Sequence, residues 1–340
     1  MLIIGCDYHP SFQQIACVNT ETGECSSRRL KHGDGEAERY YRNLGSQPVR
    51  VGVEATGGMR WFERLLAEMK FELWVGDPAR IRAAAAHKAK NDVRDAELIL
   101  QLLLEERFPQ IWMPSPEVRD NRQLVLHRHR LVQMRTRVKN QVQAMAINEG
   151  VQRKHRLWSQ AGQTELRNLP LSKWGQVRRK DLLELLEEFK GKIDPLDKNL
   201  EQEAEQRPEV RRLMTHPGIG PVVGMAYVLT LGDPHRFKRS KQVAAYLGLV
   251  PSENSTGGRQ KLGHITKQGN PVLRGLLVEA AHVAARQEPE WKRQYMRLGL
   301  KKNRSIAAVA LARRLAIRLW WMWKSGLDYQ QICESRSHAE

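Results

Sequence analysis

Residues 2–10 read LIIGCDYHP, and this stretch decides the fold. Its apolar, β-branched run ends at Asp7, which predicts a buried strand that finishes in a carboxylate. A second run of this kind, VRVGVEATGG at residues 49–58, carries Glu54 at its end. Two strands of the same domain are therefore expected to end in an acidic side chain.

Two further acids begin a helix. The stretch KAKNDVRDAELI at residues 88–99 places Asp92 and Asp95 three positions apart, so both carboxylates can face one side of the helix. Carboxylates that converge repel one another, and a divalent metal is the usual reason to bring them together. Asp7, Glu54, Asp92 and Asp95 are therefore predicted to be catalytic metal ligands suited to displacement at a phosphodiester. Any one of them alone would more often be a turn or cap residue.

The charge balance favours a polyanionic partner. Lys and Arg number 56 against 38 Asp and Glu, which gives a formal net charge of +18. A basic solvated surface could have the same composition, but an acidic centre within a basic chain indicates a nuclease or transposase. A protease or esterase lacks a Ser-His-Asp set here. Without a signal peptide, a membrane-length apolar run or paired cysteine spacing, we expect a cytoplasmic protein.

The order of the predicted elements divides the chain. Over residues 1–116, a strand, a hairpin turning at Thr22 and Gly23, and alternating strands and helices follow the order of a ribonuclease H-like domain. We expect a helical connector over residues 117–208, a mainly α-helical domain over 209–328 and a tail over 329–340. The fold class is therefore α/β followed by α.

The connector carries a seven-residue apolar repeat and many basic residues. Leu124, Leu131, Val138 and Met145 recur every seven positions in one long predicted helix. A second apolar set follows, and Pro195 is expected to break or kink that helix. The pattern predicts an antiparallel helical hairpin of coiled-coil type, able to support a dimer or tetramer. Its basic face supplies three candidate nucleic-acid contacts: Arg128, Arg135 and Lys139.

The third region contains two glycine-rich candidate sites. In HPGIG, residues 216–220, the turn could present backbone N–H groups of Gly218 and Gly220 to a phosphate, or could simply join two helices. In PSENSTGGRQKLGHITKQGN, residues 251–270, glycines permit close backbone approach to a nucleic acid. The candidate phosphate contacts of this second loop are Arg259, Lys261 and Lys267.

The same loop offers hydroxyl groups. Ser255 is a candidate nucleophile, and Ser252 and Thr256 are neighbouring hydroxyls that the sequence alone does not exclude.

Taken together, these motifs resemble the insertion sequence one-ten family of transposases, which is related to the Piv invertases. The resemblance is carried by the acidic quartet, the basic coiled coil, HPGIG, YLGLVPSENSTGG and ITKQGNPVLRGLL, and it covers nearly the whole chain. It implies a RuvC-like domain of DEDD type that binds Mg²⁺, a C-terminal transposase domain, and a homo-oligomer. It also implies donor and target DNA as substrates, and a structured non-coding RNA of the element, the bridge RNA, as guide.

The resemblance further implies that Ser255 joins covalently to DNA while the metal-bound quartet acts beside it. The sequence STGG places Thr256 between this serine and the glycines, so both hydroxyls stay candidates. We therefore predict an RNA-guided recombinase that acts at the bacterial nucleoid. The alternatives are a RuvC-like junction-resolving endonuclease that uses water without a covalent intermediate, and a non-catalytic architectural protein.

Overall fold

The computed structural model describes residues 1–85, 91–152, 156–253 and 261–337, with side chains up to residue 334. The chain forms two compact units, Met1–Met113 and Pro114–Glu340.

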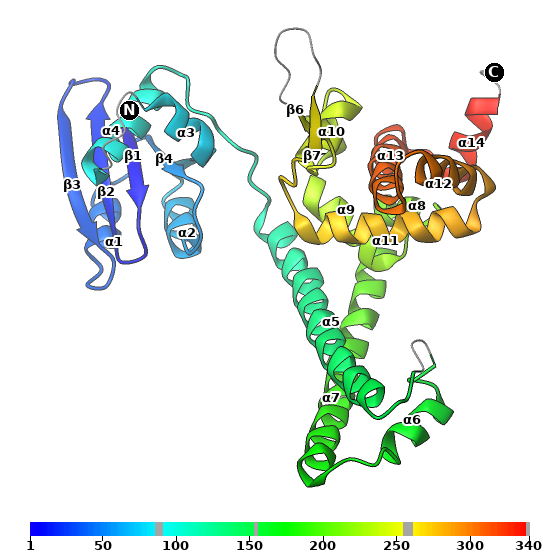
Figure 1. Cartoon of the computed structure of the whole chain (residues 1–340). Helices are drawn as coiled ribbons and strands as arrows, with labels where there is room; N and C mark the ends of the chain where they lie inside the picture. The colour runs from blue at the N-terminus through cyan, green and yellow to red at the C-terminus, as the bar shows by residue number, and fades with distance from the viewer. Residues whose placement is uncertain (86–90, 153–155, 254–260, 338–340) are drawn as a thin grey trace. The chain divides into compact units, whose positions relative to one another are not determined.

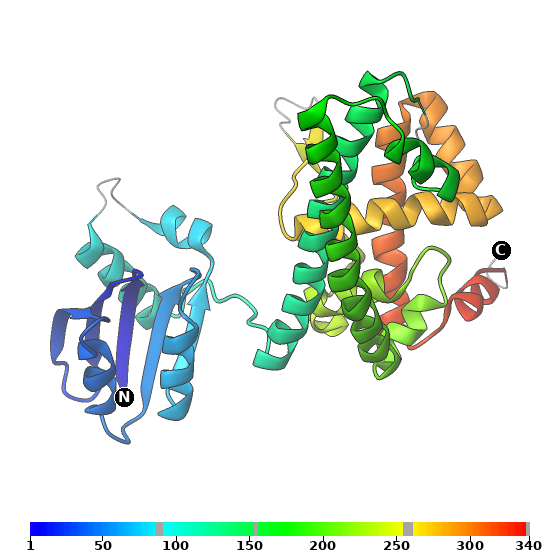
Figure 2. The ribbon, with the colours of Figure 1, turned by 90° about the horizontal axis from the view of Figure 1, so that it is seen from below.

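The first unit is built on a five-stranded mixed sheet of order β3-β2-β1-β4-β5 (Figures 1 and 2). The central strand β1 pairs antiparallel with β2 and parallel with β4, and β5 continues the parallel side. The predicted hairpin is confirmed, since β2 and β3 pair antiparallel and Gly23 has the positive φ of 75° that its tight turn requires. The strands are β1 (Leu2–Tyr8), β2 (Phe12–Asn19), β3 (Cys25–Lys31), β4 (Val49–Glu54) and β5 (Glu72–Gly76).

Helices cover both faces of this sheet. Alternate residues of β1 point in opposite directions, so Ile4 and Cys6 pack with α1 and α2, whereas Ile3 packs with α3 and α4. Asn91 caps α4, where the sequence predicts a new helix, by accepting a hydrogen bond from the backbone N–H of Val93. The helices are α1 (Glu36–Arg42), α2 (Arg60–Glu68), α3 (Pro78–Ala84) and α4 (Asp92–Leu104).

The second unit begins with a long helical hairpin. α5 (Pro116–Asn148) and α7 (Lys173–Glu205) run antiparallel side by side, as the heptads predict, with the short α6 (Gln160–Arg167) between them in the chain (Figures 1 and 2). Leu131 and Val138 are buried. Of the break or kink predicted at Pro195, the break is excluded, because α7 continues through that residue.

The rest of the second unit is helical apart from one small hairpin. α9 is apolar on all sides and lies inside the core, packed by α8 and α11. The elements are α8 (Pro208–Met214), α9 (Pro221–Leu231), the 3₁₀ helix η1 (Pro234–Arg236), α10 (Ser240–Tyr246), β6 (Pro251–Glu253), β7 (Leu262–Ile265), α11 (Pro271–Gln287), α12 (Pro289–Lys301), α13 (Arg304–Ser325) and α14 (Tyr329–Ser337). Over the described residues, no helix combines the length and the apolar character that a bilayer span requires.

Candidate metal centre and nucleic-acid contacts

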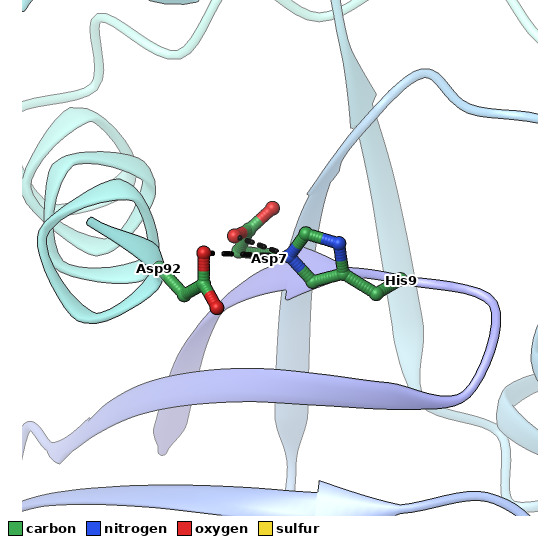
Figure 3. A group of neighbouring side chains, drawn as sticks. All are labelled: Asp7, His9 and Asp92. Atoms are coloured by element: carbon green, nitrogen blue, oxygen red, sulfur yellow. Dashed lines mark hydrogen bonds and ion pairs between the residues drawn. The ribbon is translucent and has the colours of Figure 1, made fainter. Parts of the chain in front are cut away.

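Two of the predicted acids meet at one edge of the sheet. Asp7 lies near the end of β1 and Asp92 begins α4, and one nitrogen of the His9 imidazole points toward both carboxylates (Figure 3). His9 Nε2 is 3.0 Å from Asp7 Oδ2 and 3.7 Å from Asp92 Oδ1. One ligand atom of each residue lies within 4.8 Å of the others, which is close enough for a shared cation.

Two glycines place the sheet and α4 at this distance. Gly5 precedes Asp7 by two residues on the same face of β1, and Gly52 precedes Glu54 in the same way on β4. Gly5 and Gly52 are partners in the parallel register. A Cβ on Gly5 would collide with the backbone of Ala96 and Leu100 in α4. The absence of a side chain at Gly5 therefore allows α4 to pack directly on β1.

The electrostatics of the site disfavour bare carboxylates. Burial raises the pKa of Asp7 most, and the nearby charges of Asp95 and Asp92 raise it further. His9 opposes this shift of the pKa through its charge and its hydrogen bond. A cation placed among these groups would relieve both the desolvation and the repulsion.

The other two predicted acids lie on the same side of the sheet but outside this group of three. Glu54 is the last residue of β4, and its Oε1 lies 3.7 Å from Nη2 of Arg82 in α3. Asp95 is half-buried in the first turn of α4, near enough to Asp7 for its charge to raise the pKa of that residue.

Sequence reasoning missed His9. A signal was present, because His9 follows Asp7 by two residues just after a strand, where period-two alternation keeps side chains on one side.

The donor set fits a divalent cation. Two carboxylates supply the hard oxygen ligands that Mg²⁺ and Mn²⁺ accept, and an imidazole adds a nitrogen ligand.

The predicted contacts on the helical hairpin have different surroundings. Arg128 forms a two-pronged ion pair with Asp197 of α7, with Nε–Oδ1 at 2.6 Å and Nη2–Oδ2 at 3.3 Å, so its guanidinium joins the two helices. Lys139 places Nζ 5.0 Å from the ring centre of Trp158. Partial burial, and then the charge of Arg135, lower the pKa of Lys139.

Arg135, Lys139 and Trp158 line a hollow of about 800 Å³ that residues of α6 and α7 also line. Its other charged residues are Arg167, Arg179, Lys180 and Lys190, together with Glu184, Glu187 and Glu188.

The HPGIG turn is packed inward. Gly218 has a φ of 86°, and a Cβ there would lie 2.5 Å from the carbonyl oxygen of Ala280 in α11. This close approach favours the reading of a tight interhelical turn at Gly218. Gly220, by contrast, precedes α9 with open space around its Cα.

The glycine-rich stretch of residues 251–270, predicted as a loop, contains the strands β6 and β7, which pair antiparallel. Lys261 and Lys267 are exposed, and Lys267 adopts a positive φ of 57°. Ser255, Thr256 and Arg259 lie outside the described residues.

Comparison with known proteins gives matches in both units. Residues 4–146 match the DEDD transposase family of IS110, and residues 210–296 match the transposase IS116/IS110/IS902 family.

Relatives align over most of the chain. A probable family 20 transposase of Pseudomonas aeruginosa is 28% identical over 329 residues, which cover 93% of this chain and 95% of that protein. The transposase for insertion sequence element IS1111A of Coxiella burnetii is 26% identical, covering 94% and 88% of the two chains. The transposase for IS1328 of Yersinia enterocolitica is 28% identical, covering 84% and 86%. The chain belongs to the IS110/IS116/IS902 family of insertion-sequence transposases.

Proposed function

We propose that this transposase cleaves and exchanges DNA strands with Mg²⁺ held by Asp7, Glu54, Asp92 and Asp95 in a RuvC-like domain. The meeting of Asp7 and Asp92, from the end of β1 and the start of α4, is the observation that carries this proposal. Asp95 and Glu54 lie on the same side of the sheet, and in this proposal they complete the ligand set when the metal is bound. A bound Mg²⁺ would stabilise the negative charge that develops on the phosphate during displacement.

The attacking group in this proposal is the hydroxyl of Ser255. Its attack on phosphorus would form a serine–DNA phosphodiester and break the bond to the 3′ or 5′ oxygen of the cleaved strand. The proton lost by the serine hydroxyl is balanced by the proton that the leaving oxygen takes up to become a free hydroxyl. The covalent bond would conserve the energy of the broken phosphodiester, so that a second strand could be joined without an external energy source. Thr256 is the neighbouring hydroxyl against which this assignment is tested.

Guidance by a structured bridge RNA is the third part of the proposal. The hollow between α5, α6 and α7 offers Arg135 and Lys139 for the RNA backbone, with Trp158 beside them. Base pairing by the RNA would then supply the choice of sequence, and protein contacts to phosphates would supply affinity. Lys261, Lys267, Arg259 and the N–H groups at Gly220 are proposed to contact donor and target DNA, at the bacterial nucleoid.

The proposal is tested with the full chain, its copurified RNA and a labelled DNA substrate. In Mg²⁺ the wild type should give a protein–DNA adduct that maps by mass spectrometry to the peptide containing Ser255. Ser255→Ala should bind RNA and DNA normally but form no adduct, and Thr256→Ala should form it. Asp92→Ala should abolish cleavage while it leaves RNA binding intact.

Other outcomes would decide against parts of the proposal. Cleavage without an adduct would indicate a nuclease that uses water. An adduct that survives in Ser255→Ala and vanishes in Thr256→Ala would assign the nucleophile to Thr256. Full activity of Asp92→Ala would remove the proposed metal site.

A further inference from the structure

The nitrogen atom among the carboxylates distinguishes this site from an all-oxygen one. His9 Nε2 lies 3.0 Å from Asp7 Oδ2 and 3.7 Å from Asp92 Oδ1, and the His9 side chain is only 29% exposed. Figure 3 shows one edge of the imidazole turned toward both carboxylates. Nε2 therefore points toward the place where a cation shared by Asp7 and Asp92 would lie.

These separations suit ligands of one ion. In an octahedral shell with metal–ligand distances of about 2.1 Å, neighbouring ligand atoms lie about 3 Å apart. The pair of His9 Nε2 and Asp7 Oδ2 has this spacing, and a small movement of the partly exposed Asp92 would bring its oxygen to it.

The imidazole is held in place from its other side. Its ring stacks on Phe12 with centroids 4.5 Å apart and planes inclined by 23°. The guanidinium of Arg29 lies 3.7 Å from the centre of the Phe12 ring. The backbone N–H of His9 also donates a hydrogen bond to the carbonyl oxygen of Phe12, with N···O at 2.9 Å. The β1–β2 turn thus presents Nε2 toward the acids in a fixed orientation.

We infer that His9 is a direct nitrogen ligand of the metal ion and biases the site toward Mn²⁺ over Mg²⁺. This inference rests on the metal site proposed above. Binding requires Nε2 in its unprotonated form, so the imidazole proton must lie on Nδ1 and the hydrogen bond to Asp7 must give way to the metal. Imidazole suits transition metals, whereas Mg²⁺ prefers oxygen and retains its water, so a nitrogen ligand favours Mn²⁺.

The test is binding of Mn²⁺ to the full chain freed of nucleic acid, followed by pulsed electron paramagnetic resonance. Wild-type protein should show hyperfine coupling between bound Mn²⁺ and a directly bound nitrogen, and His9→Ala should lack it. His9→Ala should also lose about tenfold or more in Mn²⁺ affinity, the size typical for loss of a residue that supports a metal site. Mg²⁺ affinity, measured by competition, should fall less.

One variant separates ligation from mere positioning of Asp7, and a second serves as a control. His9→Gln can still donate a hydrogen bond to Asp7 but has no imidazole, so it should lose the nitrogen coupling as His9→Ala does. His127→Ala, an exposed position on α5, is the matched control and should retain coupling and affinity. Mn²⁺ binding without nitrogen coupling in the wild type would overturn the role of His9 as a ligand but leave the metal site itself in place. Absence of saturable Mn²⁺ binding, or binding unchanged in Asp7→Ala, would overturn the metal site and this inference together.

Discussion

At the scale of single residues, the HPGIG motif contains a histidine that belongs to the core. His216 is 1% exposed and packs edge-on against Trp291, with ring centroids 5.3 Å apart. Its ring also lies 4.4 Å from that of Tyr329 in α14. Burial lowers the pKa of His216 to about 4, the hydrogen bond to the carbonyl of Pro217 opposes that shift, and the charge of Arg318 adds to it. The neutral imidazole is therefore a structural part of the second unit.

This histidine predicts a loss of stability in mild acid. Because its pKa in the folded protein is below the unfolded value, the unfolded chain binds more protons between pH of about 6.5 and about 4. The free energy of unfolding should therefore fall as the pH is lowered through that window, by about 3 kcal/mol from this residue. Urea unfolding of the full chain, followed by tryptophan fluorescence at several pH values, measures the effect. In His216→Gln the fall in the free energy of unfolding across this window should be smaller by that amount. An equal fall in the variant and the wild type would contradict the assignment to His216.

At the scale of elements, the packing of α4 on β1 places the acids together. Gly5 lies two residues before Asp7, and the backbone of α4 at Ala96 and Leu100 occupies the space that a side chain at Gly5 would need. Asp92 lies one turn before Ala96 on the same helix. The distance between Asp92 and Asp7 therefore depends on a residue that has no side chain.

Gly5→Ala tests this dependence. The added methyl group meets backbone rather than a flexible side chain, so α4 must shift, at a cost of about 1–3 kcal/mol typical of overpacking. Mn²⁺ affinity and DNA cleavage should fall with it, because Asp92 moves away from Asp7. Gly33→Ala, in the same unit with open space around Cα, should leave all three quantities unchanged. A Gly5→Ala protein of normal stability with intact metal binding would show that the contact does not position the site.

At the scale of the whole molecule, residues of the seven-residue repeat in α5 are buried by packing within one chain. Leu131 and Val138 are buried in the second unit, so charged substitutions there should unfold the α5–α7 hairpin as well as disrupt any assembly. An oligomer needs other apolar surface. Trp174 is 73% exposed, and Val177 and Leu185 lie with it along one side of α7 at helical spacing. If the chain forms the homo-oligomer that the family resemblance implies, we expect this stripe to bind the second copy.

Trp174→Ser combined with Leu185→Ser should therefore reduce the mass in solution to that of one chain, 39.2 kDa. Polar replacements remove apolar contact area and leave the buried seam of the hairpin intact. Light scattering measures the mass, and circular dichroism checks that helix content is retained. Leu300→Ser, which replaces an 86% exposed leucine on α12, is the control and should keep the wild-type mass. An unchanged mass in the double variant would place the assembly surface elsewhere.

Local sequence patterns determined most of the elements and two of the three residues, Asp7 and Asp92, that meet at the candidate site. The apolar, β-branched runs that end at Asp7 and Glu54, the turn at Gly23 and the cap at Asn91 each depend on the backbone preferences of a few neighbouring residues. These predictions are confirmed for that reason. Pro195 is the exception, because packing of α7 holds the helix together across a residue that locally disfavours it.

Only the tertiary structure decided which side chains meet. His9 enters the acidic group because the β1–β2 turn and α4 converge on it, and Arg128 is paired because Asp197 lies on the antiparallel helix. Gly218 supports packing on α11, which its turn motif alone could not distinguish from phosphate binding. Each of these contacts joins residues distant in sequence or on different elements. Periodicity and spacing show which residues of a segment share one face of its helix or strand. The partners of a side chain, by contrast, depend on how whole elements pack against one another.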